Sequence, residues 1–568
     1  MTPERTSEQS ASIASALAHI SAGRLVEAEA ICRAVVAADP EQGQAWHLLG
    51  GMALQQGKVD VAIDYCRRAI ALVPSLMKAH SNLGAALLAK GQVDDAIATL
   101  QSAIRRDPDF APAYVNLGDA LLKADRVEEA VAALERAVAL QPGNALAHSN
   151  LGAALTRHKR LDAAVAVLTK AVVLDPKLAS AHNNLGNALR WSGDHEGALA
   201  ALNRACELSP DMPEVYAHLG IVYRAMDRWD DAAAAFGKAL ALRPNYADGA
   251  YFRSAVLLAQ GRFAEGWRDY LDRFSMRGAM LPFHRKPLSC DLTGLRILLV
   301  KDQGLGDEIF FLRFAPELKR RGAHLTYRSS GKIAPMIRRL PFLDAVTEDD
   351  TLAPSADIIV SIGDLPFLLG MASIDDMPPS LQFPVLPDKL AAQRATLAAM
   401  GPPPYIGVTW RAGADVMKML YKIAPLESIG GVLRGTGGTL IALQREPGAG
   451  EIETLASAAQ AAVHDMTGLN DRLEEMLALL ALLDDYVTVS NTNVHLRAAV
   501  GRASSVLVPS PPEFRWMAAG SVSPWFPDST VYRQEPSGSW DQALATLTSD
   551  LASSSRTGSR AAQQGTSS

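Results

Sequence analysis

The stretch that decides the fold of the first half is Asn82–Pro108, NLGAALLAKGQVDDAIATLQSAIRRDP. It returns 34 residues later as Asn116–Pro142, NLGDALLKADRVEEAVAALERAVALQP. One glycine, two alanines and one proline keep their spacing through six copies, at Gly50, Gly84, Gly118, Gly152, Gly186 and Gly220; Ala62, Ala96, Ala130, Ala164, Ala198 and Ala232; Ala69, Ala103, Ala137, Ala171, Ala205 and Ala239; and Pro74, Pro108, Pro142, Pro176, Pro210 and Pro244. A fixed internal period of this length predicts a stack of similar structural units.

The chemistry of these columns predicts one pair of helices in each copy. Glycine and alanine let two helices approach closely, and proline cannot lie inside the preceding helix, so it starts the next repeat. The motif resembles the tetratricopeptide repeat. A degenerate copy precedes the six, and a partial copy follows them from Ala247 to about Tyr270, as expected of capping repeats. We therefore expect an all-α solenoid over residues 10–275.

A column of asparagines stands two residues before the glycines, at Asn82, Asn116, Asn150 and Asn184. Asparagine is a mediocre helix former. One interpretation is a solvated helix face that was copied when one repeat was duplicated. The other is a row of amides in a concave groove, where each side chain can hold a peptide backbone without reading its sequence. The column resembles the asparagine ladder of protein O-GlcNAc transferases, and a polypeptide partner is expected in either case.

The composition of the 568 residues is that of a globular protein, with 48% hydrophobic and 20% charged residues. The net charge of −6 gives no basic field for nucleic acid or an acidic membrane. The four cysteines lie far apart and form no CxxC pair, which favours a reducing compartment. Met1–Ser10 is polar, and no window is long and apolar enough to cross a bilayer. The expectation is a cytoplasmic protein without membrane insertion.

The second half alternates short apolar runs with amphipathic stretches, which predicts parallel α/β structure. A proline-rich break at Met377–Pro387 separates two such halves. We expect two Rossmann-like lobes, at 290–400 and 401–552, that face a cleft. The expected strands are Leu295–Val300, His324–Arg328, Asp357–Ser361, Tyr405–Trp410, Thr439–Gln444, Tyr486–Ser490 and Ser504–Val508; helices are expected at Lys332–Leu340, Lys389–Met400, 450–462 and 471–483. Residues 553–568 are polar and are expected to form a disordered tail.

The first candidate for chemistry is the loop KDQGLGDE, Lys301–Glu308, which follows an expected strand. Gly304 and Gly306 permit close backbone approach, and the next helix N-terminus favours negative charge. The loop lacks the lysine and hydroxyl residue of a Walker motif. Asp307 at the helix start is either an N-capping residue or a general base at the strand end.

Two further candidates follow strands of the second lobe. Arg411, Lys418 and Lys422 could neutralise a diphosphate leaving group, or could be ordinary solvated charges. The string SNTNVHL, Ser490–Leu496, starts a helix and could offer N–H groups and hydroxyls to phosphate. His495 in that helix is either structural or catalytic. The candidate donor-binding residues are Gly304, Gly306, Arg411, Lys418, Lys422, Asn491, Thr492, Asn493 and His495.

The segment ILLVKDQGLGDEIFFLRFAPEL, Ile297–Leu318, resembles the opening of heptosyltransferase-like glycosyltransferases of the two-domain GT-B fold. IGVTWRAG, SNTNVHLRAAVG and SSVLVP resemble the donor-binding half of that family. The resemblance implies that Asp307 is the catalytic base and that a nucleotide sugar binds between the lobes. Many relatives carry an aspartate where this chain has Ser490. The whole arrangement resembles bacterial proteins with tetratricopeptide repeats before a glycosyltransferase domain, including those that modify flagellin.

The resemblance implies a metal-independent, inverting transferase without a cofactor. It would move a sugar from a nucleotide donor to Ser or Thr of a protein held by the solenoid, with flagellin as one candidate acceptor. No carboxylate cluster has metal-ligand spacing. Two alternatives stay open, namely a transferase for glycan or lipid-linked acceptors and a non-catalytic repeat scaffold that senses a nucleotide sugar.

Overall fold

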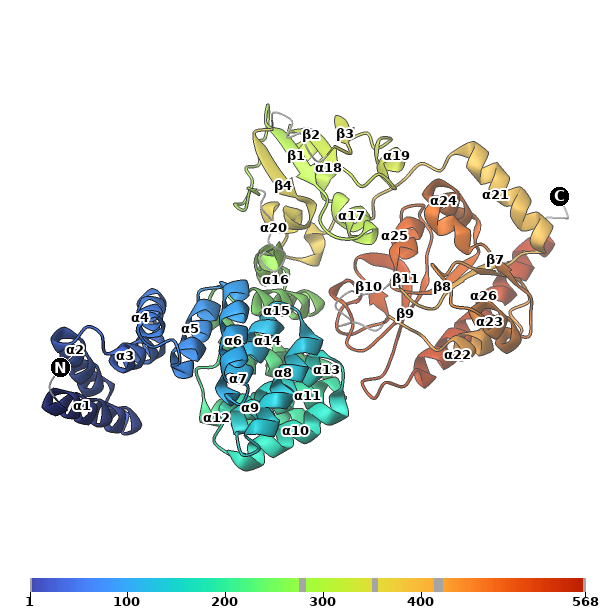
Figure 1. Cartoon of the computed structure of the whole chain (residues 1–568). Coiled ribbons are helices and arrows are strands. Elements are labelled where there is room, and N and C mark those ends of the chain that lie inside the picture. The colour runs from blue at the N-terminus through green and yellow to red at the C-terminus, as the bar shows by residue number, and fades with distance from the viewer. Residues whose placement is uncertain (1–2, 275–281, 350–355, 413–421, 565–568) are drawn as a thin grey trace. The chain divides into compact units, whose positions relative to one another are not determined.

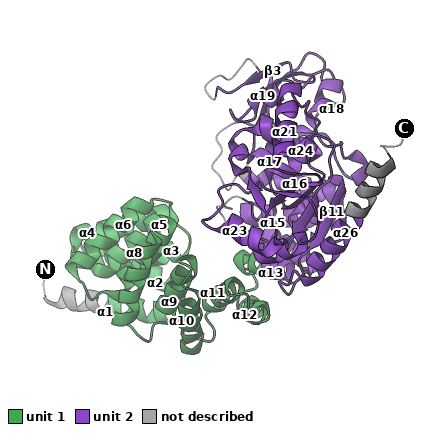
Figure 2. Ribbon diagram, turned by 90° about the vertical axis from the view of Figure 1, so that its right-hand side faces the viewer, with its two compact units in different colours: residues 1–218 green, residues 219–568 purple. Residues whose placement is uncertain are grey.

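The structure is a computed structural model that describes residues 3–274, 282–349, 356–412 and 422–564. The chain divides into two compact units, Met1–His218 and Leu219–Ser568 (Figure 2). Lys418 lies between 412 and 422 and so outside the described residues.

The first unit consists of paired α-helices (Figure 1). The expected helical solenoid is confirmed, and each repeat contributes two helices of 13 and 14 residues from α3 to α12. The helices are α1 (Pro3–Ser21), α2 (Leu25–Ala38), α3 (Gly43–Gln55), α4 (Val59–Leu72), α5 (Met77–Ala89), α6 (Val93–Arg106), α7 (Ala111–Lys123), α8 (Val127–Leu140), α9 (Ala145–Arg157), α10 (Leu161–Leu174), α11 (Ala179–Trp191), α12 (His195–Leu208) and α13 (Pro213–Ala225), which runs into the second unit.

The glycine column is explained by the close approach of the two helices in a repeat. A Cβ added at Gly152 would lie 2.2 Å from Cγ of Leu168, and one at Gly84 would lie 2.5 Å from Cγ of Leu100. Real Cβ atoms do not come so close to other carbon atoms, so only glycine fits without a shift. The alanines of both columns are fully buried for the same reason.

The second unit begins with the last repeats, formed by α14 (Trp229–Leu242), α15 (Ala247–Ala259), α16 (Phe263–Tyr270) and the 3₁₀ turn η1 (Leu271–Phe274). Trp267 is 1% exposed, and its ring centroid lies 5.6 Å from that of Phe514 and 5.9 Å from that of Trp525. Arg273 is buried in ion pairs with Asp302 and Asp364. These contacts explain why the compact units divide inside the repeats and not near residue 275.

The first α/β lobe holds a four-stranded parallel sheet in the order β3-β2-β1-β4. Its apolar strands lie in one buried core with α17. The elements are β1 (Arg296–Val300), α17 (Leu305–Leu312), α18 (Ala315–Arg320), β2 (His324–Arg328), α19 (Ala334–Ile337), β3 (Ala345–Thr347), β4 (Ile358–Ser361), η2 (Ile362–Asp364), α20 (Leu365–Leu368) and η3 (Ile374–Asp376).

The second lobe holds a seven-stranded sheet in the order β10-β11-β9-β8-β5-β6-β7, and only the β10–β11 pair is antiparallel. The elements are α21 (Pro387–Met400), β5 (Tyr405–Thr409), α22 (Leu426–Leu433), β6 (Thr439–Ala442), α23 (Glu451–Ala459), β7 (Val463–Asp465), η4 (Thr467–Asp471), α24 (Leu473–Leu482), β8 (Asp485–Val489), α25 (Thr492–Ala498), β9 (Ser505–Val508), η5 (Phe514–Trp516), β10 (Val522–Ser523), β11 (Phe526–Arg533) and α26 (Asp541–Gln564).

The α/β class is confirmed, with differences at individual elements. The helix expected at Lys332–Leu340 shortens to α19, which has a proline in its first turn. The sequence did not indicate β3, β7, β10 or β11. α26 extends to Gln564, into the segment 553–568 for which the sequence predicts a disordered tail. Within the part of the chain that the structure describes, no helix has the length and apolar character needed to span a membrane.

The packing of the last repeats predicts where the solenoid can be cut. A fragment 1–243 ends after α14 and keeps its helix pairs, whereas 1–280 also contains Phe263, Trp267 and Tyr270, whose partners lie in the α/β lobes. We expect both fragments to be helical, because each repeat packs mainly on its neighbours. The 1–243 fragment uncovers mainly Phe236, which packs on Phe252 of α15, so 1–280 should bind more hydrophobic dye and self-associate more than 1–243, as measured by dye fluorescence and light scattering.

A dye signal from 1–243 equal to that of 1–280 would show that these aromatic residues are not the exposed surface. Little helix in 1–243 by circular dichroism would contradict the independence of the solenoid itself.

Candidate functional site

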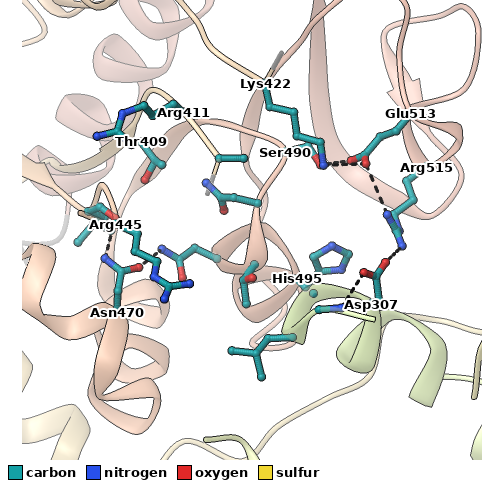
Figure 3. A pocket seen from close by; sticks show the side chains of 18 residues that line it. Asp307, Thr409, Arg411, Lys422, Arg445, Asn470, Ser490, His495, Glu513 and Arg515 are labelled. Carbon is teal, nitrogen blue, oxygen red and sulfur yellow. Dashed lines mark hydrogen bonds and ion pairs between the residues drawn. The ribbon is translucent and has the colours of Figure 1, made fainter. Parts of the chain in front are cut away.

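Loops that follow strands of both sheets line one cavity of about 350 Å³ (Figure 3). Strand ends are where parallel sheets place ligand-binding loops. The cavity brings together eight of the nine candidate donor-binding residues and also Asp307; the ninth is Lys418. The lining is Gly304, Leu305, Gly306, Asp307, Thr409, Arg411, Ala412, Lys422, Leu443, Arg445, Asn470, Ser490, Asn491, Thr492, Asn493, His495, Glu513 and Arg515.

Asp307 is the third residue of α17, which begins directly after the glycine loop. Its carboxylate accepts a hydrogen bond of 3.2 Å from the backbone N–H of Gly304, so it does help to cap the helix. The same carboxylate forms an ion pair with the Arg515 guanidinium. The side chain is 20% exposed and reaches the cavity. The capping and the catalytic interpretations of Asp307 are therefore compatible.

Gly306 lies at a close contact between the two lobes, where a larger residue would press on His495. A Cβ at this position would lie 3.1 Å from Cδ2 and 3.3 Å from Nε2 of His495. α17 of the first lobe thus packs directly against α25 of the second. Glu308 fixes the other side of α17, because its buried carboxylate accepts hydrogen bonds from Tyr327 and Ser330 at the end of β2, both at 2.8 Å.

Four charged side chains form a chain of alternating sign along one wall of the cavity (Figure 3). Lys422 Nζ lies 2.9 Å from Glu513, Arg515 lies between Glu513 and Asp307, and Ser490 donates a hydrogen bond to Glu513. Burial acts to raise the pKa of Glu513, but the charges of Lys422 and Arg515 outweigh it and lower the pKa to about 2. Glu513 is therefore ionised at neutral pH and holds both cations in place.

The basic loop is positioned by backbone pairing. Ala412 N–H donates to the carbonyl of Lys422 at 3.0 Å, and Ala424 N–H donates to Trp410 at 2.9 Å. Arg411 forms an ion pair of 3.1 Å with Glu451. Arg411 and Lys422 line the cavity as the sequence predicts, but each already faces a carboxylate.

Arg445 is the most exposed cation of the lining. Its side chain is 56% exposed, and its guanidinium lies 3.6 Å from the neighbouring Glu446, which is 83% exposed. An ion pair that is so exposed to water contributes little stabilisation. Arg445 can therefore turn to an anionic ligand with little loss.

The polar string at the start of α25 lies at the cavity wall. Asn491 is the N-cap, and its side-chain oxygen accepts from Val494 N–H at 3.3 Å, while its amide donates to Thr488 at 2.8 Å. Asn493 donates to Asn470 at 3.4 Å. Thr492 is the first residue of the helix and also lines the cavity. Asn491 and Asn493 are thus fixed by neighbours, and their side chains shape the wall.

His495 is 5% exposed and packs its ring against Phe526 and Phe310, with centroids 5.2 and 6.0 Å apart. Its Nδ1 is buried and has no hydrogen-bond partner among the described residues. Burial, followed by the charges of Arg515 and Arg313, holds the pKa of His495 well below its usual value. The imidazole is neutral at pH 7 and adds no positive charge to the cavity.

The asparagine column of the first unit makes hydrogen bonds between repeats. Asn116 donates to the hydroxyl of Ser81 at 2.9 Å, Asn184 donates to that of Ser149 at 3.1 Å, and Asn82 lies 3.3 Å from Nδ1 of His47. Each partner stands 35 residues earlier. The amide nitrogens therefore tie one repeat to the preceding one, a structural role that the sequence did not indicate.

Asn150 is the exception in this column, because the residue 35 positions earlier is Val115. Its side chain makes no hydrogen bond within the described part of the chain. The side-chain oxygens of Asn82 and Asn116 are likewise without a donor among the described residues. All four asparagines are half-buried, so part of each amide stays accessible.

Sequence reasoning missed Glu513, Arg515, Arg445 and Asn470. Glu513 and Arg515 follow β9 in the string PPEFRW, so charged residues after a buried strand were the available signal. Arg445 and Asn470 follow β6 and β7 in the same way. Within the described ranges, His, Cys, Asp and Glu side chains form no group of three that could hold a metal ion.

The family models match the repeats. Sequence models described as Tetratricopeptide repeat match residues 9–76, 81–145, 115–179 and 213–246, and a TPR repeat model matches 186–227. The N-terminal region is therefore a tetratricopeptide-repeat solenoid.

Protein FlbA of Caulobacter vibrioides is 26% identical over 335 residues, which cover 54% of this chain and 55% of FlbA. The chain thus spans about half the length of the curated relative it matches.

Two solved structures illustrate the structural matches. The Cut9–Hcn1 hetero-tetramer of APC/C has a TM-score of 0.37 at 23% identity and covers 40% of this chain and 45% of its own. A tetratricopeptide repeat protein from Parabacteroides merdae has a TM-score of 0.36 at 15% identity, with 44% of this chain and 98% of its own covered.

Replacing Glu513 with Gln tests the charge chain. The variant leaves Lys422 and Arg515 without their shared carboxylate, so its free energy of unfolding should fall by about 3 kcal/mol at pH 7. Because the pKa of Glu513 is lowered in the fold, its stabilisation is complete above about pH 4.5 and is lost as the pH falls towards 2. Denaturant unfolding at pH 7 and pH 3 should show the difference from wild type shrink at pH 3.

Glu446→Gln is the matched control, because Glu446 is exposed; it should change stability by less than about 0.5 kcal/mol at both pH values. A Glu513→Gln difference as large at pH 3 as at pH 7 would show that the effect does not come from the carboxylate charge.

Proposed function

We propose that this protein is an inverting glycosyltransferase of GT-B type that moves a sugar from a nucleotide donor to a hydroxyl of a protein. The acceptor oxygen bonds to the anomeric carbon, while the bond from that carbon to the phosphate oxygen breaks. The phosphate keeps the electron pair, and Asp307 takes the hydroxyl proton. A positioned carboxylate base contributes about 10²–10⁴-fold to such a step.

One observation carries the proposal. Asp307, which the resemblance implies to be the base, lines the same cavity as Arg411, Lys422, Arg445 and Arg515. A base and several cations at the ends of parallel strands suit a reaction whose leaving group is a phosphate. A cavity of about 350 Å³ suits a small ligand.

The solenoid supports the acceptor side of the proposal. An extended stack of repeats offers a long surface for a polypeptide. The Asn82 and Asn116 amide nitrogens are directed towards the preceding repeat, which leaves their oxygens to accept N–H groups from a bound chain. Flagellin is the first acceptor to test, because the order of repeats and transferase resembles that of flagellin-modifying proteins.

A non-catalytic nucleotide-sugar sensor is the second candidate, and one observation favours it. Lys422 and Arg515 are each paired with a carboxylate, so the cavity without a ligand holds much of its positive charge neutralised. A transferase for glycan or lipid-linked acceptors shares the same donor site. Intact mass of the protein acceptor distinguishes both functions from the proposed one, because only the proposed function adds a sugar to a protein.

Asp307→Asn tests catalysis directly. Asn can still accept the Gly304 N–H, so capping is kept, while the basic charge is lost. We expect the rate of sugar transfer, followed by intact mass of the acceptor, to fall about 100-fold or more. The lost ion pair with Arg515 should lower stability modestly, and donor binding should persist.

Asp528→Asn, an exposed aspartate, is the matched control and should transfer at the wild-type rate. Native-rate transfer by Asp307→Asn would place the base elsewhere. An unchanged mass for every protein acceptor with the wild-type enzyme would favour the sensor.

Alanine substitutions in the asparagine column test acceptor capture. Asn82, Asn116, Asn150 and Asn184 replaced together should weaken acceptor binding tens-fold, at about 0.5–1.5 kcal/mol for each hydrogen bond. The single variants separate binding from stability. Asn116→Ala should lower both, because it also breaks the bond to Ser81, whereas Asn150→Ala should lower affinity alone.

Binding by calorimetry and unfolding by denaturant supply the two measurements. Lys170→Ala, on the exposed face of α10, is the control that should change neither. Unchanged affinity in the quadruple variant would leave the column with its role between repeats alone.

A further inference from the structure

Arg515 occupies a special place in the wall of the cavity, between two carboxylates (Figure 3). Its NH2 group donates to Asp307, and its NH1 group lies 3.6 Å from Glu513. Its Nε is buried and has no partner among the described residues. The guanidinium carbon lies 4.6 Å from the ring centroid of Phe310 and 4.9 Å from that of Phe514. Packing on two rings holds the guanidinium in the wall beside the open cavity.

The two carboxylates beside Arg515 differ in how many other hydrogen-bond donors they have. Glu513 also receives Lys422, Ser490 and the indole N–H of Trp516, so several other donors satisfy it. Asp307 receives only the Gly304 N–H besides Arg515 in the described structure. The bond between Arg515 and Asp307 is therefore the one that a new anion can displace. A guanidinium fork fits phosphate as well as carboxylate, so a phosphate in the cavity would compete with Asp307 for the same N–H groups.

We propose that Arg515 binds the phosphate of the donor and that this phosphate displaces Asp307 from the guanidinium. The proposal rests on the proposed function for its biological ligand. Before the donor binds, Arg515 occupies the carboxylate that would act as base. When phosphate takes the N–H of Arg515, an oxygen of Asp307 becomes free to accept a proton. The base is thus available only when the donor is in place.

The charges remain balanced through the reaction. The hydroxyl proton moves to Asp307, the new bond forms at the anomeric carbon, and the electron pair of the broken bond stays on the phosphate beside Arg515. After product release and loss of the proton, Asp307 pairs with Arg515 again. When the ion pair between Arg515 and Asp307 forms again, the site is back in the state that it had before the donor bound.

Inorganic pyrophosphate is the probe, so the test needs neither the sugar nor the acceptor. Its dissociation constant is measured by calorimetry with the full-length wild type, Asp307→Asn, Arg515→Gln and the double variant. The measurements are made in about 0.5 M salt, where long-range charge effects are largely screened. Asp307→Asn should bind pyrophosphate about three- to tenfold more tightly, because Arg515 has lost its competitor. Arg515→Gln should bind about tenfold more weakly or worse.

The double variant decides between competition and a general charge effect. With Arg515 absent, Asp307→Asn should change the affinity by less than about twofold. An equal tightening in both backgrounds would overturn the competition, and unchanged binding by Arg515→Gln would overturn the assignment of Arg515. Glu446→Gln removes a carboxylate beside Arg445 instead, and it should change the affinity equally in both backgrounds.

Two further measurements keep the test decisive. Arg515→Lys retains the charge without the fork and should bind between wild type and Arg515→Gln, which guards against a Gln variant that folds poorly. Arg262→Gln, at an exposed pair with Glu265, should bind like wild type. The pyrophosphate affinities can show the competition between Asp307 and phosphate for Arg515 while no protein acceptor gains mass. In that case the assignment of Arg515 stands and the transferase proposal fails.

Discussion

The candidate site depends on one aromatic cluster, centred on Trp267, that joins three parts of the second unit. Trp267 of the last repeat lies edge-on to Phe311 of α17 and to Phe514 and Trp525 of the second lobe. The four rings come from three regions of the sequence, and all are buried. Because Phe310 and Phe514 also carry the Arg515 guanidinium, the packing that joins the lobes also positions the charged wall. The last repeat is therefore part of the support of the site.

The charge of the cavity follows from the same arrangement. Each of its four cations has a carboxylate nearby, and in three of these pairs both partners are largely shielded from water, namely Arg411 with Glu451, Lys422 with Glu513 and Arg515 with Asp307. Such pairs hold long side chains in place before a ligand arrives. The entropic cost of ordering these side chains on binding is therefore smaller. The exposed Arg445 is the cation most easily turned to a ligand. The charged side chains of this cavity are therefore held in place by one another, and their pairing leaves little excess charge.

The helical half and the strand-end loops were predictable from the sequence because each leaves a local signal. The 34-residue period requires only that every repeat make the same contacts, as Gly152 does with Leu168. Loops after β1, β5 and β8 follow apolar runs, and parallel strands end at one edge, so Asp307, Arg411 and Asn491 could be placed together. The short strands β3 and β7, of three residues each, have no detectable period.

What the sequence could not indicate are contacts between distant segments. Arg515 pairs with Asp307, which lies 208 residues earlier, and the sequence around neither residue predicts this pair. The asparagine column left two interpretations open, a solvated face and a binding ladder, and neither included its hydrogen bonds to Ser81 and Ser149, because these require the stacking of two repeats. The division of the compact units inside the repeats has the same origin, since Trp267 and Arg273 find their partners in the α/β lobes.

Hydrogen–deuterium exchange with and without nucleoside diphosphates tests whether the cavity is the donor site, because it locates the ligand without assuming a reaction. We expect slower exchange in three segments together: 301–312 around Asp307, 490–498 at the start of α25, and 511–516 around Arg515. The solenoid residues 43–208 should exchange at an unchanged rate. Protection confined to other segments, or no protection with any nucleoside diphosphate at saturating concentration, would contradict a donor site in this cavity.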